Sequence, residues 1–166
     1  MTTLRLRLRA SVLVLCAAAV VGAGLPAFAE SVSGVAVQAL PCIPTSYDAV
    51  STQFDCQGTS TWEGTWNGQA VFHAKGKLDL ITGDASGTVE ERFFGATANG
   101  HAGELHVSGT VTIDGVTGLE TVRVTILDGS VDFKGATGSV TFLAFSPLSG
   151  GPAEGTYSGT WTHPAY

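Results

Sequence analysis

Residues 103–129 read GELHVSGTVTIDGVTGLETVRVTILDG, and their apolar and polar side chains alternate with a period of two. Such alternation is typical of antiparallel strands that bury one face and expose the other to water. The Asp-Gly pairs at 114–115 and 128–129 predict tight turns, because glycine adopts the positive φ that such turns need. The residues predicted to face inward are Leu105, Val107, Val111, Ile113, Val122, Val124 and Ile126.

The same period extends in both directions from this stretch. It predicts strands over 69–80 and 137–145, and no segment after Gly58 shows apolar residues at helical spacing. About eight short strands result, and a flat sheet of that size would expose two edges that invite aggregation. A barrel removes both edges. The sequence therefore predicts an all-β fold, an eight-stranded antiparallel β-barrel over residues 58–166.

A near-repeat of the phrase G-T-W indicates how the barrel closes. Residues 58–66 read GTSTWEGTW and residues 155–161 read GTYSGTW. Glycine admits close approach between strands, and flanking aromatic rings cover it. We therefore predict that the first and last strands pair with each other; duplication of a half-barrel is the alternative, but no long internal repeat supports it. Alternation places on one face of each strand Trp62, Gly64 and Trp66, and Tyr157, Gly159 and Trp161.

Residues 1–29 have the pattern of a secretory signal peptide. Three arginines precede an apolar run that ends in Ala27-Phe28-Ala29, an A-x-A pattern that signal peptidase accepts. An uncleaved membrane anchor is the alternative, since the run is long enough to span, but its glycines and Pro26 lie where a signal peptide breaks its helix. We expect cleavage before Glu30 and a secreted, extracellular protein without a stable membrane anchor.

The remaining 137 residues suit one domain with a sizeable core. They carry five Lys and Arg against 14 Asp and Glu, a formal net charge of −9. With so few cations, phosphate neutralisation cannot drive binding, which argues against nucleic acid as a partner. Anionic lipid surfaces are disfavoured for the same reason.

Residues 30–57 precede the barrel and contain Pro41, Pro44 and a scatter of Ser, Thr and Ala. We interpret them as an irregular, extended N-terminal arm. Two cysteines remain after removal of the signal peptide, and an even pair in a secreted chain predicts a disulfide, here Cys42–Cys56, that pins the arm to the barrel. No C-x-x-C or H-x-x-x-H spacing accompanies the pair, so a metal site is the weaker interpretation.

Residues 129–161, GSVDFKGATGSVTFLAFSPLSGGPAEGTYSGTW, resemble the C-terminal half of the allene oxide cyclase and dirigent type of β-barrel. Small secreted actinobacterial proteins of unknown function are similar there. The resemblance implies an eight-stranded barrel, in some members of which small apolar substrates are cyclised or steered. A second resemblance comes from Gly64-Thr65-Trp66, a G-x-W triplet as in lipocalins and, more loosely, avidins. A lipocalin would also bring a late arginine over this tryptophan, and no Lys or Arg follows Lys134.

The chain has no G-x-S-x-G, H-E-x-x-H or P-loop motif, and its histidines (His73, His101, His106 and His163) have no metal-binding spacing. We expect solvated histidines, no metal and no cofactor. The stretch TVEERFFG, 88–95, is more informative, because Glu91 faces inward if Val89 and Phe93 do. Burial would raise its pKa and make it a candidate general acid or base. In the opposite register Phe94 faces inward instead; Glu91 could also reach solvent at a bulge or pair with Arg123. Glu120 shares a face with Val122 and Val124 but lies at a strand end, so we expect it to be solvated.

Aromatic side chains either fill the interior of an eight-stranded barrel or line a cavity for one small ligand. Abundant small inward residues, such as Ala70 and Ala74, favour a cavity. The leading hypothesis is non-enzymatic binding of a small apolar molecule. The alternatives are a cofactor-independent cyclase or isomerase that uses Glu91, and a packed barrel that serves as an extracellular interaction module. The candidate ligand-binding residues are Trp62, Trp66, Phe72, Phe93, Phe142 and Trp161.

Overall fold

The structure is a computed structural model that describes residues 28–39, 41–146 and 151–163. Within these ranges the chain forms nine β-strands joined mostly by short turns. Their bounds are β1 (Phe28–Ala39), β2 (Cys42–Tyr47), β3 (Ser51–Gly64), β4 (Trp66–Asp79), β5 (Ala85–Thr97), β6 (Ala102–Ile113), β7 (Leu119–Val131), β8 (Thr137–Phe145) and β9 (Ala153–His163).

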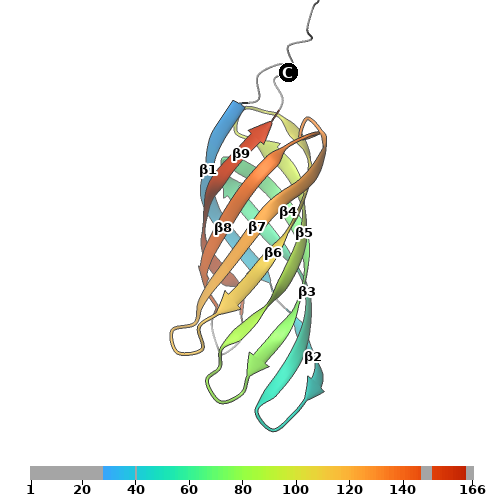
Figure 1. Cartoon of the computed structure of the whole chain (residues 1–166). Coiled ribbons are helices and arrows are strands. Elements are labelled where there is room, and N and C mark those ends of the chain that lie inside the picture. The colour runs from blue at the N-terminus through green and yellow to red at the C-terminus, as the bar shows by residue number, and fades with distance from the viewer. Residues whose placement is uncertain (1–27, 40, 147–150, 164–166) are drawn as a thin grey trace, which may run out of the picture.

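Eight of the strands close into an antiparallel barrel (Figure 1). The sheet runs in the order β1-β9-β8-β7-β6-β5-β4-β3, and β1 also pairs with β3, which joins the two ends. The ninth strand, β2, pairs with the first half of β3 and extends the wall at one end of the barrel. The predicted all-β, eight-stranded antiparallel barrel is therefore confirmed.

The N-terminal segment 30–57 is more regular than the predicted irregular arm. It supplies most of β1, all of β2 and the first half of β3, and β1 is a full member of the barrel wall. Along β1, Val32 and Ala36 are buried in the core, whereas Val35 and Val37 are exposed. The outward valines obscure the alternation in the sequence, although the backbone keeps the period of two.

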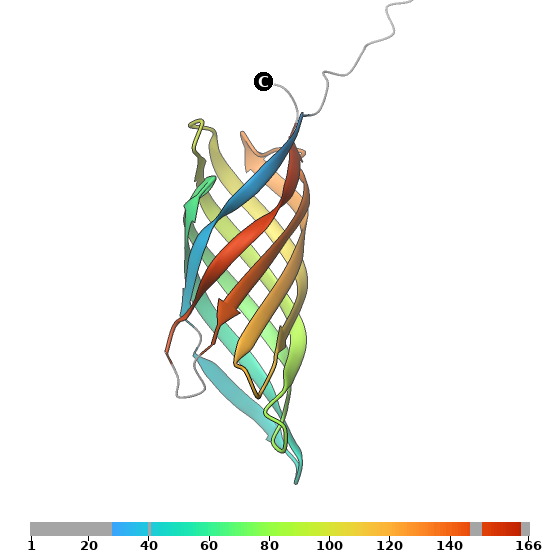
Figure 2. The ribbon, with the colours of Figure 1, turned by 90° about the vertical axis from the view of Figure 1, so that its left-hand side faces the viewer.

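The closure of the barrel differs from the predicted pairing of first and last strands. Figure 2 shows β1, in blue, lying beside β9, in red, and β1 separates β9 from β3. Gly34 on β1 is the backbone partner of both Gly64 on β3 and Tyr157 on β9. The two copies of the G-T-W phrase thus lie near one another but do not pair directly.

Trp62 and Trp66 also lie on different strands, because the chain turns between them. β3 ends at Gly64, where φ is +135°, and β4 begins at Trp66. The Asn67 side chain holds this turn: its amide oxygen accepts from the Gly64 N–H at 3.1 Å, and its amide nitrogen donates to the Gly64 carbonyl at 2.8 Å. Trp62 and Trp66 therefore face the core from adjacent strands rather than from one.

The two predicted Asp-Gly turns have different outcomes. Asp114-Gly115 lies in the β6–β7 turn, where the Asp114 carboxylate accepts from the backbone N–H groups of Val116 and Thr117. Asp128-Gly129, in contrast, lies inside β7, beside a register shift against β6 in which Leu127 is the extra residue. A β-bulge, not a turn, explains that Asp-Gly pair.

The predicted signal peptide falls almost entirely on residues 1–27, outside the described residues, and it stays a prediction. Its last two residues, Phe28 and Ala29, begin β1 and pair with His163 and Thr162. In the described part of the chain, no helix is long and apolar enough to cross a membrane.

Candidate functional site

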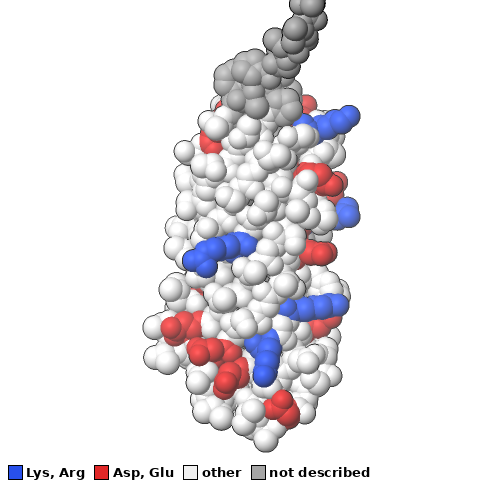
Figure 3. Space-filling view, in the orientation of Figure 1, with Lys and Arg blue, Asp and Glu red and all other residues white. Residues whose placement is uncertain are grey.

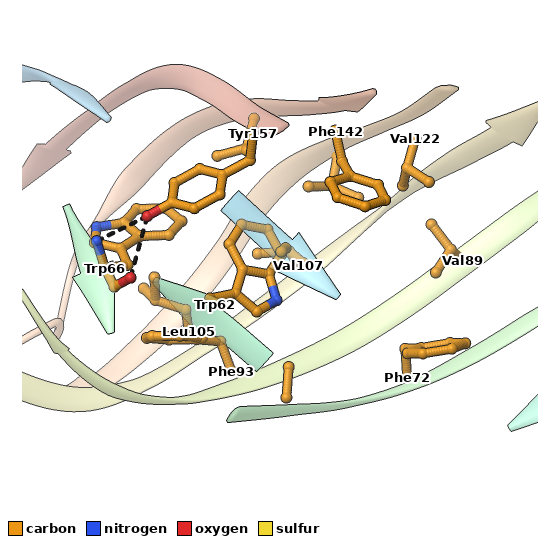
Figure 4. Packing of buried hydrophobic residues seen from close by; sticks show 14 of the residues in the cluster. Trp62, Trp66, Phe72, Val89, Phe93, Leu105, Val107, Val122, Phe142 and Tyr157 are labelled. Carbon is orange, nitrogen blue, oxygen red and sulfur yellow. Dashed lines mark hydrogen bonds between the residues drawn. The ribbon is translucent and has the colours of Figure 1, made fainter. Parts of the chain in front are cut away.

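One end of the barrel interior is filled by aromatic rings (Figure 4). Trp62 lies 4.6 Å from Tyr157 and 6.1 Å from both Trp66 and Phe93, measured between ring centroids. Trp161 meets Trp66 edge-on at 5.6 Å. We call these five residues the aromatic cluster; every member is buried. Phe133 from the β7–β8 turn packs edge-on against Trp161 and covers this end of the barrel.

Glu91 lies beside the aromatic cluster and faces inward, as the sequence predicts. Only 3% of it is exposed, whereas its neighbour Phe94 is 47% exposed. The Ser60 hydroxyl donates to Glu91 Oε1 at 2.6 Å, and the Trp62 indole N–H is shared between Ser60 Oγ at 2.7 Å and Glu91 Oε1 at 3.2 Å. Burial raises the pKa of Glu91, and the two hydrogen bonds oppose this only in part.

The interior space beside the Glu91 side chain is too small to hold a substrate. Glu91 borders a void of about 10 Å³, close to the minimum for one water molecule. The other walls of this void are apolar side chains of the barrel core, and Arg123, the predicted alternative partner, is exposed on the outer face of β7. The catalytic role of Glu91 stays a prediction, and the geometry describes a hydrogen-bonded carboxyl inside a packed core.

A larger cavity, of about 250 Å³, lies at the opposite end of the barrel. We call this the cavity end; the turns at 48–50, 80–84 and 114–118 lie there. Exposed residues such as Cys42 and Gly151 are among its lining, so the cavity reaches the surface. Its lining is mostly apolar and is formed by Gln38, Cys42, Phe54, Cys56, Phe72, Ala74, Leu78, Ala85, Ser86, Val89, Val111, Ile113, Glu120, Val122, Ser146 and Gly151.

Glu120 is the one acidic side chain among these lining residues. It is 2% exposed, and its Oε2 atom has no hydrogen-bond partner among the described residues. Burial raises the pKa of Glu120, and a hydrogen bond from the Ser146 side chain opposes the shift. Glu120 is placed there by β7, whose alternation continues inward through Val122 and Val124. A buried carboxyl oxygen without a partner is unfavourable and is available to a ligand that donates to it.

The disulfide Cys42–Cys56 is present and borders this cavity. The two cysteines are directly opposite one another on β2 and β3. The bond fixes β2, which pairs with β3 beyond the reach of β1, to the barrel wall. It therefore helps to shape the cavity end as well as to stabilise the chain.

The predicted ligand-binding residues fall into two groups. Phe72 lines the cavity, whereas Trp62, Trp66, Phe93 and Trp161 pack against one another in the aromatic cluster. Phe142 is buried between the two regions and lies beside Val122 in Figure 4. The barrel is thus packed at one end and hollow at the other, which combines both interpretations of its aromatic residues.

Sequence reasoning sets Glu120 aside as solvated, because it begins a strand. Glu120 is two and four positions from Val122 and Val124, so strand alternation places all three side chains on the inner face. Small side chains at Ala74 and Ala85 leave the space beside it. The sequence pattern of this site is therefore an inward-facing carboxyl group, Glu120, together with small inward-facing side chains on other strands.

The four histidines do not form a metal site among the described residues. His73 Nε2 lies 2.6 Å from Asp55 Oδ1, and His106 lies 3.9 Å from Asp128, both on the outer face. His101 and His163 lie near one another at the aromatic end, with ring centroids 6.2 Å apart. His163 is 7% exposed, so the expectation of a solvated side chain is wrong for this residue.

No family model matches the chain, and no curated protein matches it. Its fold is similar to a protein of unknown function of the DUF3224 family from Shewanella oneidensis MR-1. The TM-score is 0.62 at 11% identity, over 83% of this chain and 100% of that one. It is also similar to a pterocarpan synthase dirigent protein, with a TM-score of 0.51 at 10% identity over 84% of this chain and 90% of that one. The predicted dirigent-like barrel is confirmed as a fold.

Proposed function

We propose that this protein binds a small, predominantly apolar molecule in the cavity end of its barrel. The observation that carries the proposal is the cavity of about 250 Å³ that reaches the surface while the rest of the interior is packed. An apolar cavity of roughly 150 Å³ already accepts benzene. The space beside Phe72, Val89 and Val122 therefore suits a molecule of one or two rings.

We further propose that the protein acts outside the cell. The signal-peptide pattern of residues 1–29 and the Cys42–Cys56 disulfide support this proposal, because disulfides persist in oxidising compartments. Mass spectrometry of the protein from culture medium tests it. A chain that begins at Glu30 and lacks two hydrogens is the expected result, whereas retention of the full chain inside the cell would contradict it.

Binding is tested by calorimetric titration with three naphthalene compounds that carry the polar group on the same methylene: 1-naphthylmethylamine, 1-naphthylmethanol and 1-naphthylacetate. Ala74→Phe places a ring in the cavity, and Thr88→Phe places the same ring on the exposed outer face of β5. We expect at least one compound to bind the unmodified protein and Thr88→Phe equally, and to bind Ala74→Phe at least tenfold more weakly. Thermal unfolding of each variant shows that it is folded.

Failure of all three compounds to bind would overturn the proposal. Binding that Ala74→Phe leaves unchanged would overturn it as well, because the compounds would then occupy another surface. Either result favours the alternative function, an extracellular interaction module that acts through the acidic surface of the barrel.

A further inference from the structure

Glu120 Oε2, which has no hydrogen-bond partner among the described residues, indicates which polar group the ligand carries; the apolar walls of the cavity do not. Oε2 is buried, without a hydrogen-bond partner in the described part of the chain, at the edge of a cavity that can admit a ligand. A group that donates a hydrogen bond to this oxygen would remove the cost of leaving it unpaired. The remaining question is whether that donor is neutral or positively charged.

The cavity itself supplies no positive charge to Glu120. None of the described lining residues is a lysine, arginine or histidine. The Ser146 side chain contributes a hydrogen bond, which favours the ionised carboxyl but does not neutralise it. Within the described lining, the charge of an ionised Glu120 is left to be balanced by whatever enters the cavity.

The turns around the cavity end add further negative charge. The described residues of these turns, together with Asp79 at the end of β4, include four aspartates and no lysine or arginine; they are residues 48–50, 79–84, 114–118, 146 and 151–152. Hydrogen bonds from Ser51 and from backbone N–H groups of the turns hold the pKa values of Asp48, Asp79 and Asp114 low. These carboxylates are therefore ionised at neutral pH.

On the face shown in Figure 3, carboxylates in red gather toward this end of the barrel, with a few Lys and Arg, in blue, among them. Lys77, on β4, is the cation close enough to lower the pKa values of Asp48 and Asp79. The four aspartates outnumber this lysine, so the turns of the cavity end have an excess of negative charge. A site lined by one sign of charge attracts ligands of the other sign.

We propose that the ligand of this cavity is an apolar amine whose ammonium group pairs with Glu120. This inference rests on the proposed binding function and specifies the ligand's chemical class. The ammonium donates to Oε2, and the apolar body of the ligand packs against Phe72, Val89 and Val122. A neutral alcohol satisfies the same oxygen with one hydrogen bond but gains nothing from the acidic turns. A carboxylate ligand is repelled by both.

The three compounds share a naphthylmethyl body and differ in its polar group, which is cationic in the amine, neutral in the alcohol and anionic in the carboxylate, so their ranking tests the inference on the unmodified protein. We expect the amine to bind at least tenfold more tightly than the alcohol, and the carboxylate to bind most weakly. Equal affinities, or tighter binding of the alcohol, would overturn the amine assignment and leave the binding function intact. If none of the three binds, the binding function fails with it.

Two variants locate the preference. Glu120→Gln removes the buried carboxyl that can pair with an ammonium, and Glu154→Gln removes an exposed carboxylate at the start of β9 near the same end. We expect the preference for the amine over the alcohol to fall at least tenfold in Glu120→Gln and to change less than twofold in Glu154→Gln. A preference that survives in Glu120→Gln would overturn the pairing with Glu120 and assign the effect to the acidic turns.

Discussion

The hydroxyl of Tyr157 on β9 joins the backbone of Trp66 on β4 across the closure of the barrel. It accepts a hydrogen bond from the Trp66 N–H at 3.0 Å and donates one to the Trp66 carbonyl at 3.1 Å (Figure 4). β1 and β3 lie between these strands in the sheet. One side chain therefore links the two G-T-W phrases that strand pairing does not join.

Tyr157→Phe tests the energetic value of this link. The variant keeps the ring but leaves the buried N–H and carbonyl of Trp66 without these partners, so we expect the free energy of unfolding to fall by about 1–3 kcal/mol. Urea unfolding followed by circular dichroism measures the change. Tyr47→Phe, at a side chain that is 72% exposed, is the matched control. A loss no greater than that of the control would show that the link contributes nothing.

Gly34 on β1 lies beneath the Tyr157 ring, and we expect Gly34→Ala to be strongly destabilising. An added Cβ would lie 2.0 Å from the Glu63 carbonyl oxygen and 2.5 Å from Tyr157 Cε1. Overpacking of this kind costs about 3 kcal/mol or more, because the backbone carbonyl cannot yield without moving the sheet. The change is measured by urea unfolding.

Gly100→Ala separates the effect of contact from that of backbone conformation. Gly100 has a φ of +87°, and an added Cβ would meet no atom of the described residues within 4 Å. We therefore expect a loss of about 1 kcal/mol from conformation alone. Similar losses in Gly34→Ala and Gly100→Ala would contradict the close packing of β1 against Tyr157.

Reduction of the Cys42–Cys56 disulfide should destabilise the protein by about 3 kcal/mol, the value that loss of chain entropy gives for a closed loop of about 15 residues. The cysteines are 14 positions apart, and the bond borders the cavity, so ligand affinity should fall as well. Guanidinium unfolding with and without reductant measures the first effect. The double variant Cys42→Ser, Cys56→Ser should be equally unstable and insensitive to reductant; a stability equal to that of the oxidised protein would contradict the prediction.

The period-two pattern was sufficient to predict the barrel, because inward residues such as Val107, Val124 and Val140 alternate with polar ones. It failed where an outward apolar residue or a side-chain-mediated turn hides the local signal. On β1 the outward Val35 and Val37 conceal the strand. Between Trp62 and Trp66 the alternation continues through a turn that the Asn67 side chain completes, so the sequence reads as one strand.

The candidate site was predicted less completely than the fold. Strand alternation identified Glu91 and the aromatic residues as inward-facing. It cannot show which layers of the barrel interior are filled by side chains and which contain a cavity. That depends on which side chains meet across the interior: the aromatic cluster meets at one end, whereas Ala74 and Ala85 leave space at the other. Strand alternation places the Glu120 side chain on the same inner face as Val122. Only its position beside the cavity distinguishes it from a solvated residue at the start of a strand.

Glu91 should make the protein less stable as the pH rises. Burial raises the folded-state pKa of Glu91 above its usual 4.5, and the side chains around it supply no opposing charge: Ser60 and Trp62 on β3, Phe72 on β4 and Val107 on β6. Between the unfolded and folded pKa values, the folded chain holds a proton that the unfolded chain has lost. The favourable contribution is complete below the unfolded pKa and is lost as the pH rises through the folded pKa.

Glu91→Gln should remove this dependence, at about 1.4 kcal/mol for each unit by which burial raises the pKa. The Gln carbonyl can still accept from Ser60 and Trp62, and any cost of its buried amide is the same at every pH. Urea unfolding from pH 4 to pH 8 should therefore show the variant gaining stability relative to the unmodified protein as the pH rises. Glu90→Gln, on the exposed face of β5, should run parallel to the unmodified protein. If Glu91→Gln also runs parallel, Glu91 titrates as a solvated carboxyl and is not held in its neutral form by the core.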